Sequence, residues 1–390
     1  MARLGDYIEQ IRGVSYKPDD ICSQGEENAV AILRANNIQD DGLNFDDLVY
    51  VKKSKVSNNQ FIKAGDIVVC ASSGSKNLVG KASIAKVDLA MSFGAFCKVV
   101  RATKVLPEYL GYYFQSPTYR SKISDLAGGA NINNIRNEHI DELFIVVPDW
   151  KDQVTIAQKL DKICELISFQ KLQLLKLDEL VKSRFIELFG DPEQNQLGWD
   201  KKPLSAIITN ANNGMARRGN NSQGNIVMRL VELQDGYIDY SAPNRIILTD
   251  AEKQKYLLRD KDFLFARVNG NPEYVGRCAV FHEIGEPVYH NDHIIRVHFD
   301  DTVITGFFAS ALFNSTYGRR QMRSQIKTSA GQYTISQDGI GAIVAILPPL
   351  ELQQQFAAFV EQTDKSKLAV QQSIEKLETL KKALMQKYFG

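Results

Sequence analysis

Two stretches of the chain carry the spacing of apolar residues that is typical of a long helix. From Lys151 to Phe189 the apolar residues recur at alternating intervals of three and four positions, namely at 156, 160, 163, 167, 174, 177, 181 and 188, which predicts one helix with an apolar seam. The end of the chain carries an equivalent seam, interrupted by two polar residues, at Phe356, Val360, Val370, Ile374, Leu377, Leu384 and Tyr388 with Thr363 and Lys367 between them. Because a long helix gains most of its stability from packing, we expect the two helices to pair.

The remaining regions alternate short apolar runs with turns rich in Gly, Asn and Ser. In residues 1–150 the pattern predicts three strands and one helix, at Asp66–Ala71, Phe96–Arg101, Leu143–Val147 and from Pro107 to about Ala127. Residues 200–350 repeat the scheme, with strands at Ile226–Val231, Phe263–Val268, Ile294–Phe299 and Ile343–Leu347 and a helix near Ile304–Ile326. Each region therefore predicts a compact α+β domain.

The second half of the chain repeats the first. Pro148, Gln153 and the terminal Phe189-Gly190 recur 200 positions later, as Pro348, Gln353 and Phe389-Gly390. Upstream the offset drifts by a few residues, and the matched pairs are Arg34 with Arg229, Gly65-Asp66-Ile67 with Lys261-Asp262-Phe263, Val79-Gly80-Lys81 with Val275-Gly276-Arg277, and Phe114-Gln115-Ser116 with Phe313-Asn314-Ser315. The helices keep their register while the globular parts diverge, which indicates a duplication with two divergent heads.

The repeat and the helices together predict the organisation of the chain. We expect globular domains at 1–150 and 191–347 and helical segments at 151–190 and 348–390. Since the first helix leads from one globular domain to the other, an intramolecular pair must run antiparallel, as a coiled coil that gives the internal repeat a pseudo-twofold axis. About 38 residues at ~1.5 Å each make a rod of roughly 55 Å. A plain dimerisation coiled coil is the alternative.

Composition limits the class of protein but leaves its function open. The chain has 390 residues, 44% hydrophobic and 24% charged, with a formal net charge of +1, so a nucleic-acid role must rest on local clusters of charge. No stretch approaches the roughly 20 apolar residues of a membrane span, and the amino terminus lacks a signal peptide's apolar core. We therefore expect a cytoplasmic protein. Its five cysteines include no C-x-x-C pair, which suits reduced thiols.

None of the apparent catalytic motifs is complete. The segment Gly74–Lys81 has five residues between its glycines where a phosphate-binding loop has four, and it continues with Ala82 in place of Ser or Thr. Asn271-Pro272-Glu273-Tyr274 resembles the Asn-Pro-Pro-Tyr motif of DNA amino-methyltransferases, but without a glycine-rich cofactor motif it predicts only a turn. Four histidines cluster without a metal-ligand spacing, at 282, 290, 293 and 298. We expect no catalytic group, metal or cofactor on this chain.

Local clusters of basic and amide side chains favour DNA as the ligand. From Ala71 to Lys104 there are six basic residues, Lys76, Lys81, Lys86, Lys98, Arg101 and Lys104, against one acid, Asp88. From Tyr317 to Lys327 no acid neighbours Arg319, Arg320, Arg323 and Lys327, which suits a helix face along phosphates. Asn and Gln can bond adenine and Arg can bond guanine. The candidate DNA-binding residues are Ser73, Lys76, Asn77, Lys81, Asn131, Asn133, Arg136, Arg217, Arg218, Arg267, Asn269, Asn271, Arg277, Arg319, Arg320, Arg323, Gln332 and Tyr333.

This order of segments resembles the specificity subunits of Type I restriction-modification enzymes. The resemblance rests on the two variable domains, each followed by a helix that opens near Pro148-x4-Gln153 and ends in Phe-Gly, on the signatures GDIVVCASSGSKNLVGK and KDFLFARVNGNPEYVGR, and on PPLELQQQFA from Pro348. The family's Pro-Pro-Leu-x-Glu-Gln opening is altered in both copies, with Asp149-Trp150 in the first and Gln353-Gln354 in the second. The match covers essentially the whole chain.

The resemblance implies a non-catalytic subunit that reads double-stranded DNA. Each globular region would be a target recognition domain for one half of a split sequence, and the helices would set the spacer and hold two methyltransferase subunits, which restriction subunits join. S-adenosylmethionine, ATP and magnesium would belong to those partners. The alternatives are a single-chain DNA-modifying enzyme, which would bind S-adenosylmethionine itself, and a coiled-coil scaffold whose heads bind protein.

Overall fold

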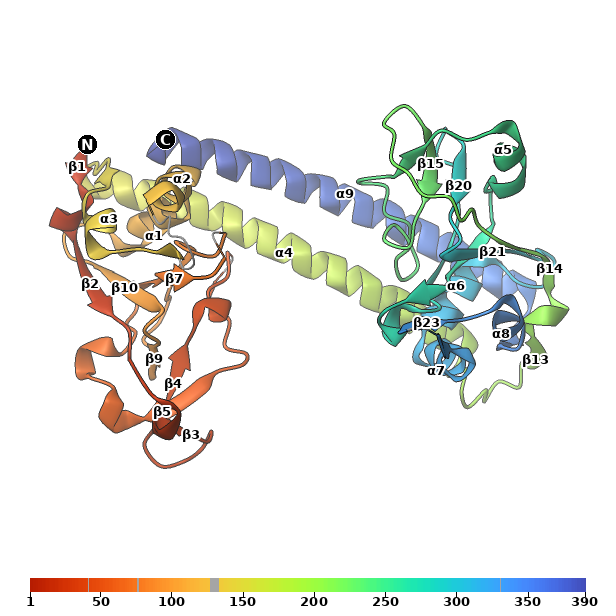
Figure 1. Cartoon of the computed structure of the whole chain (residues 1–390), viewed down its shortest axis with the longest axis horizontal. Helices are drawn as coiled ribbons and strands as arrows, with labels where there is room; N and C mark the ends of the chain where they lie inside the picture. The colour runs from red at the N-terminus through yellow and green to blue at the C-terminus, as the bar shows by residue number, and fades with distance from the viewer. Residues whose placement is uncertain (41, 76, 127–132, 330) are drawn as a thin grey trace. The chain divides into compact units, whose positions relative to one another are not determined.

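The computed structural model describes residues 1–40, 42–75, 77–126, 133–329 and 331–390 (Figure 1). The chain forms two compact units. Unit 1 comprises Met1–Leu172 and Gln371–Gly390, and unit 2 comprises Gln173–Val370. Each unit therefore combines one globular head with part of each long helix, α4 (Trp150–Phe189) and α9 (Leu350–Phe389). None of the described helices is long and apolar enough to cross a membrane.

The described part of unit 1 contains two four-stranded sheets and three short α-helices. The first sheet is antiparallel in the order β2-β10-β6-β8, made of Ile8–Arg12, Cys97–Ala102, Ile67–Cys70 and Ala82–Ile84. The second has the order β3-β5-β4-β9, made of Ile21–Cys22, Val49–Lys52, Ala29–Leu33 and Met91–Phe93, and its β4–β9 pair is parallel. Two short antiparallel pairs complete the strands, β1 (Ala2–Arg3) with β12 (Phe144–Ile145) and β7 (Ser72–Ser73) with β11 (Asn133–Asn134).

The helix predicted from Pro107 to about Ala127 is two helices, α1 (Pro107–Gln115) and α2 (Pro117–Leu126). The break lies at Ser116, whose backbone is extended. Pro117 explains it, because a proline disfavours helical geometry in the residue before it and donates no amide hydrogen bond. A third helix, α3 (Asn137–Asp141), precedes β12.

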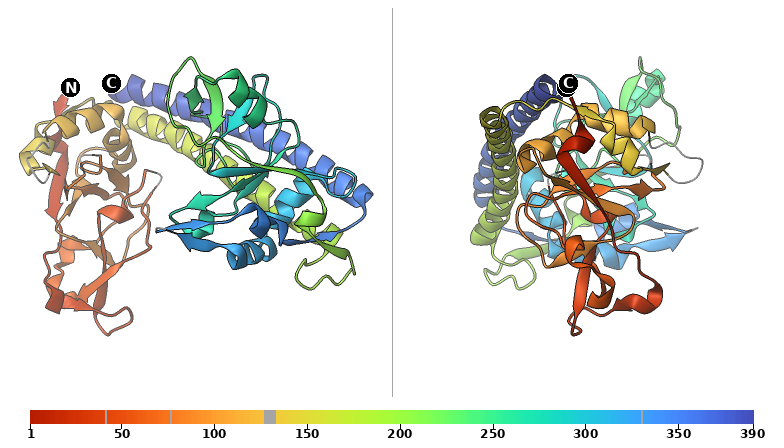
Figure 2. Two further views of the ribbon diagram at one scale, coloured as in Figure 1. Left: turned by 45° about the vertical axis from the view of Figure 1, so that its right-hand side comes forward. Right: turned by 90° about the vertical axis from the view of Figure 1, so that its left-hand side faces the viewer.

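The core of unit 1 joins its head to both long helices. Tyr109 and Tyr113 of α1 are buried with Leu160 of α4 and Phe389 of α9, and the rings of Tyr109 and Phe389 lie 5.0 Å apart. Figure 2 shows the last turns of α9 beside the first turns of α4 in this unit. The apolar seam therefore continues into the globular core.

Unit 2 repeats this plan. Its main sheet has the antiparallel order β14-β21-β17-β19, made of Ile208–Asn213, Ile294–Phe299, Phe263–Ala266 and Cys278–Val280. A second sheet has the order β16-β15-β20, made of Arg245–Ile246, Asn225–Met228 and Val288–His290, and a third the order β18-β23-β22, made of Val268–Asn269, Gln332–Thr334 and Lys327–Ser329. The strands β13 (Asp200–Pro203) and β24 (Val344–Leu347) pair, and the helices are α5 (Asp250–Tyr256), α6 (Gly306–Asn314), α7 (Thr316–Gln325) and α8 (Gln337–Gly341).

The helix predicted near Ile304–Ile326 is again interrupted. Ser315 has an extended backbone between α6 and α7, and its hydroxyl accepts a hydrogen bond from the Gly318 amide at 3.3 Å. A serine at this position starts a new helix, since its side chain satisfies an amide that the first turn leaves free. In the core Phe185 and Phe189 of α4 pack against Phe308 and Phe356.

A buried glutamine fixes the start of each long helix to its own head. The Gln153 side chain donates to the Pro148 carbonyl at 2.8 Å and accepts from the Leu106 amide at 2.8 Å. In unit 2, Gln353 donates to Pro348 at 2.9 Å and accepts from Thr305 at 2.9 Å. These amides satisfy backbone groups that would otherwise be buried without partners, which is why both copies of the repeat keep a glutamine here.

The two polar interruptions of the second seam have partners inside unit 2. The Thr363 hydroxyl donates to the Phe359 carbonyl at 2.9 Å, and Lys367 binds Asp178 of α4 at 2.7 Å. In unit 1, Gln170 of α4 donates to Ser373 of α9 at 2.7 Å. Polar contacts between α4 and α9 thus occur in both units.

Candidate nucleic-acid interface

In the first head, a short strand pair brings together two segments that contain predicted DNA-binding residues. After β6 the chain continues through Ala71 into β7, where Ser73 lies opposite Asn133 of β11. The Ile135 amide donates to the Ala71 carbonyl at 2.8 Å and fixes this register. The structure therefore places the predicted residues Ser73 and Asn133 at one site.

The second head builds the same site with different residues. Asn269 of β18 lies opposite Tyr333 of β23, and the Ile335 amide donates to the Arg267 carbonyl at 2.9 Å. Gln332 lies beside Tyr333 on β23 and is exposed. Backbone hydrogen bonding is thus common to the two copies while the side chains at the paired positions differ.

A tight turn closes each site and carries a cation. The Gly80 amide donates to the Cys70 carbonyl and the Gly276 amide to the Ala266 carbonyl, both at 2.8 Å. Both glycines have φ of +79°, a conformation that favours glycine. The next residues are Lys81 and Arg277, so the equivalence of these two cations, predicted from the repeat, is confirmed.

An acid and an amide, missed in the sequence, position each of these cations. The Lys81 ammonium donates to Gln39 at 3.2 Å and lies 3.6 Å from Asp40. The Arg277 guanidinium donates to Gln234 at 3.2 Å and lies 3.4 Å from Asp235. A signal was present, because these Gln-Asp pairs belong to the matched segments AILRANNIQDDG and IVMRLVELQDG. Arg277 also stacks 3.9 Å from the centre of the Tyr274 ring, a favourable cation–π geometry.

An arginine from a helix lies near the turn in each head, but only the first head's arginine binds the turn itself. Arg120 of α2, also missed in the sequence, donates to the carbonyls of Val79 at 2.8 Å and Asn77 at 2.7 Å. The predicted residue Asn77 is thereby held through its backbone. Arg319 of α7 binds Asp235 and the Asn314 side chain instead.

The expectation that the arginines of α7 lack acidic partners is wrong. Arg320 binds Glu193 at 2.9 Å, and Arg323 binds Glu273. These acids come from segments distant in sequence, so a search for neighbouring charges cannot find them. Exposed ion pairs of this kind contribute little to stability.

The two arginines of the loop at 217–218 also bind acidic side chains that are distant in the sequence. Arg217 binds Glu252 through two nitrogens, Nε at 3.0 Å and Nη2 at 2.7 Å, and this contact, with the hydrogen bonds from Thr249, lowers the pKa of Glu252 to about 2. Arg218 binds Asp292 at 2.7 Å. Both arginines line a hollow of about 290 Å³ together with Arg229, Asn244 and Asn291 among other residues.

Two of the six basic residues between Ala71 and Lys104 bind partners within the fold. Lys98 is buried, and its ammonium donates to Gln10 at 3.0 Å and to Asn137 at 2.8 Å. Burial lowers the pKa of Lys98 to about 8. Arg101 binds the buried Asp66 through two bonds of 2.7 Å. Both point from β10 into the fold, which a charge count along the sequence cannot reveal.

The other predicted DNA-binding residues differ in exposure and in hydrogen bonding. Arg136 is exposed just before α3, and Arg267 donates to the Asp292 carbonyl at 3.1 Å. Asn271 accepts from the Glu273 amide at 3.0 Å and begins a single 3₁₀ turn, as the turn prediction required. Lys76 and Asn131 lie outside the described residues. Among the described residues, no three His, Cys, Asp or Glu side chains are grouped as a metal site.

Comparisons with known proteins identify the family of this chain. A family model described as the Type I restriction modification DNA specificity domain matches residues 1–177. The Type I restriction enzyme StySPI specificity subunit of Salmonella potsdam is 33% identical over 396 residues, covering 97% of this chain and 86% of that protein. The EcoKI specificity subunit of Escherichia coli is 30% identical over 398 residues, with the same coverage.

The fold is also found in a solved structure. The S subunit of the Type I restriction-modification system from M. genitalium has a TM-score of 0.58 and 15% sequence identity, with 100% of this chain and 95% of that chain covered. The identity to the Salmonella and Escherichia coli proteins places the chain in the family of Type I restriction-modification specificity subunits, the subunits that recognise the DNA sequence.

Proposed function

We propose that the two heads read the two halves of one split double-stranded DNA target. The observation that carries this proposal is the strand pair shared by the heads, in which Ser73 and Asn133 stand where the other head has Asn269 and Tyr333. A common backbone with different side chains suits two readers that approach DNA alike but select different bases. On this proposal 1–150 and 191–347 are the target recognition domains.

The cations around each strand pair would then hold the DNA backbone. Lys81 and Arg277 sit beside the paired strands, and their acidic partners are exposed or half-exposed. Because an exposed ion pair is worth only about 0–1 kcal/mol, a DNA phosphate can take the place of Asp40 or Asp235. These contacts would supply affinity, and the loop side chains would supply sequence preference.

The segments 151–190 and 348–390 would set the spacer between the half-sites. Unit 1 unites the first turns of α4 with the last turns of α9, and unit 2 unites the last turns of α4 with the first of α9, which supports antiparallel pairing as a coiled coil. A helix of 40 residues is about 60 Å long at ~1.5 Å per residue. This length suits half-sites one or more helical turns apart.

The helices would also dock two methyltransferase subunits. In unit 1, Leu166, Phe169 and Leu172 of α4 are 40%, 66% and 49% exposed, and an exposed apolar row is typical of a protein interface. Restriction subunits would join the assembly. S-adenosylmethionine, ATP and magnesium would be bound by these partners, and this chain would have no catalytic role.

The proposal is tested by mapping methylated adenines in cells that express this chain with its partner methyltransferase. We expect a split motif. Ser73→Ala should alter the preference in one half of the motif and Asn269→Ala in the other half only. Ser54→Ala, an exposed serine of the first head, is the matched control and should leave both halves unchanged. A continuous motif, or a change in both halves from one substitution, would refute the two-reader model.

A deletion tests the spacer role separately. Removal of 170–176 and 370–376 takes one heptad from each helix in register. The spacer should shorten while both half-sequences persist. If the half-sequences change and the spacer does not, the helices do not determine the distance.

A further inference from the structure

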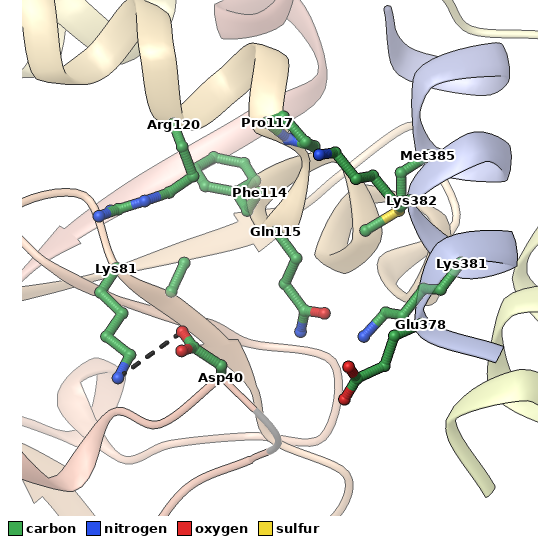
Figure 3. A pocket seen from close by; sticks show the side chains of 11 residues that line it. Asp40, Lys81, Phe114, Gln115, Pro117, Arg120, Glu378, Lys381, Lys382 and Met385 are labelled. Atoms are coloured by element: carbon green, nitrogen blue, oxygen red, sulfur yellow. Dashed lines mark ion pairs between the residues drawn. The ribbon is translucent and has the colours of Figure 1, made fainter. Parts of the chain in front are cut away.

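Unit 1 contains an open hollow of about 260 Å³ between its head and the last turns of α9 (Figure 3). Lys81, Gln115 and Arg120 line it from the head, and Lys381 and Lys382 line it from α9. A liquid water occupies about 30 Å³, so the hollow has room for a phosphate group together with hydrating water. Polar side chains line it from both sides, beside the apolar Phe114, Pro117 and Met385, as Figure 3 shows.

The charges around the hollow favour an anion. Four cations line it, Lys81, Arg120, Lys381 and Lys382, against two acids, Asp40 and Glu378. Asp40 is engaged with Lys81 at 3.6 Å, the ion pair drawn in Figure 3. Among the residues that the structure describes, no ion pair engages Lys381 or Lys382. The lining therefore keeps an excess of two positive charges, with both α9 lysines available.

The start of α2 adds to this preference. Pro117, the first residue of this ten-residue helix, lines the hollow, and a helix amino terminus carries partial positive charge that favours anions. The hollow also adjoins the turn from Asn77 to Gly80, because Arg120 lines the hollow and donates hydrogen bonds to the carbonyls of Asn77 and Val79 in that turn. An anion in the hollow would thus lie next to the turn that carries Lys81.

We propose that this hollow binds a phosphate of the DNA backbone and that Lys381 and Lys382 are phosphate contacts. The inference rests on the proposed function and extends it, since α9 then belongs to the DNA-binding surface of the first head in addition to its spacer role. DNA is the expected source of the phosphate, because the adjoining turn carries the predicted DNA-binding residue Lys81. A phosphate in the hollow would contact α2, this turn and α9 together.

The second head has only part of this arrangement. At the positions 200 residues earlier, Lys382 corresponds to Lys182, whereas Lys381 corresponds to Val181, which packs against the core of unit 2. Asp178, the counterpart of Glu378, is engaged with Lys367 at 2.7 Å. The lysine pair is therefore a feature of unit 1, and its contribution is not duplicated by the repeat.

The test measures the salt dependence of binding of the full chain to a duplex that contains its mapped motif. Each phosphate contact contributes about 0.9 to the slope of log K against log salt. Because both lysines contact the same phosphate, Lys381→Gln with Lys382→Gln should lower the magnitude of the slope by about one, weaken binding at low salt and leave the methylated motif unchanged. Lys376→Gln, an exposed lysine of the same helix outside the hollow, should keep the original slope.

Two further variants separate charge from structural damage. Lys381→Arg with Lys382→Arg keeps both charges and should keep the slope, whereas Glu378→Gln should strengthen binding at low salt. An unchanged slope for the double Gln variant overturns the inference and leaves the two-reader model standing. Failure of the unaltered chain to give a split motif refutes the two-reader model itself.

A last arm tests free phosphate as the ligand. Sodium tripolyphosphate is added to the unaltered chain and to the double Gln variant, and their melting temperatures are compared. If tripolyphosphate stabilises only the unaltered chain while the DNA slopes of the two proteins agree, the hollow binds a free anion and the DNA contact is refuted.

Discussion

His290 should make the second head unstable in acid. The side chain is buried at the end of β20, and its Nδ1 donates to the Tyr256 carbonyl at 3.1 Å. Burial, reinforced by nearby Arg296, lowers the pKa of His290 to about 4 from an ordinary value of 6.5, although hydrogen bonds to the Tyr256 and Asn212 backbones act in the opposite sense.

The direction of the pH dependence follows from how many protons the folded and the unfolded chain bind. Above pH 6.5 the histidine is neutral in both the folded and the unfolded chain, and the head keeps its full stability. As the pH falls from 6.5 toward 4, the unfolded chain binds a proton that the folded chain does not. Each pH unit then costs about 1.4 kcal/mol. The free energy of unfolding should therefore fall by about 3 kcal/mol over this window, with no further loss from this group below it.

The assay is urea unfolding of the full chain at several pH values between 7.5 and 4. His290→Asn keeps an N–H donor near the position of Nδ1 but cannot titrate, so the difference between the two proteins isolates the histidine. His282→Asn replaces a histidine of the same unit that is 50% exposed, and it should follow the unaltered chain. Parallel pH dependences for His290→Asn and the unaltered chain would refute the reasoning.

Three other substitutions test the architecture. Gln353→Leu should lower the free energy of unfolding in urea by about 2–3 kcal/mol, because the Thr305 amide and two buried carbonyls lose their partner; a loss under about 0.5 kcal/mol would contradict this role. Gly276→Ala should lower the melting temperature, since the new Cβ would lie 2.5 Å from the Met322 sulfur at a φ of +79°. When Met322→Ala is added, the double variant should lose less melting temperature than the sum of the two single losses. Additive losses would rule out the clash. Burial lowers the pKa of Lys98 to about 8 from its ordinary value of 10.5, so the contribution of this lysine to stability is complete above pH 10.5 and is lost as the pH falls through 8. Lys98→Met should therefore flatten the rise of the free energy of unfolding in urea between pH 7.5 and 9.5. An equal rise in both proteins would contradict this role of Lys98.

The repeat made much of the fold predictable. The long helices were located within one or two residues, at Trp150–Phe189 and Leu350–Phe389, and the strand Ile294–Phe299 was predicted at its observed bounds. Periodicity did not separate α1 from α2, because apolar spacing continues across Ser116. The break between the two helices could have been predicted from Pro117, whose ring disfavours helical geometry at the preceding residue without altering the spacing of apolar residues.

The candidate site was predictable where it follows the backbone and unpredictable where it depends on long-range pairing. Ser73 and Asn133 belong to two loops that the sequence had already nominated, and a strand pair joins them. The environment of Arg323 is set instead by Glu273, fifty residues away in the chain. Charge counted within a window of sequence therefore overestimates the free charge of a surface, since compensating acids arrive through the fold.

The acidic partners also bear on how a specificity subunit can be selective. A bare cluster of cations binds any duplex through its phosphates. In both heads the turn cation instead starts with an acid beside it, Asp40 for Lys81 and Asp235 for Arg277. If these cations bind phosphates as proposed, a phosphate that displaces the carboxylate would gain less than it would from a free cation, and the non-specific part of the affinity would be lower. The loop side chains would then contribute a larger share of the total affinity for the correct sequence. Two such acids at equivalent positions, beside loops that have otherwise diverged, are what selection for discrimination over raw affinity would preserve.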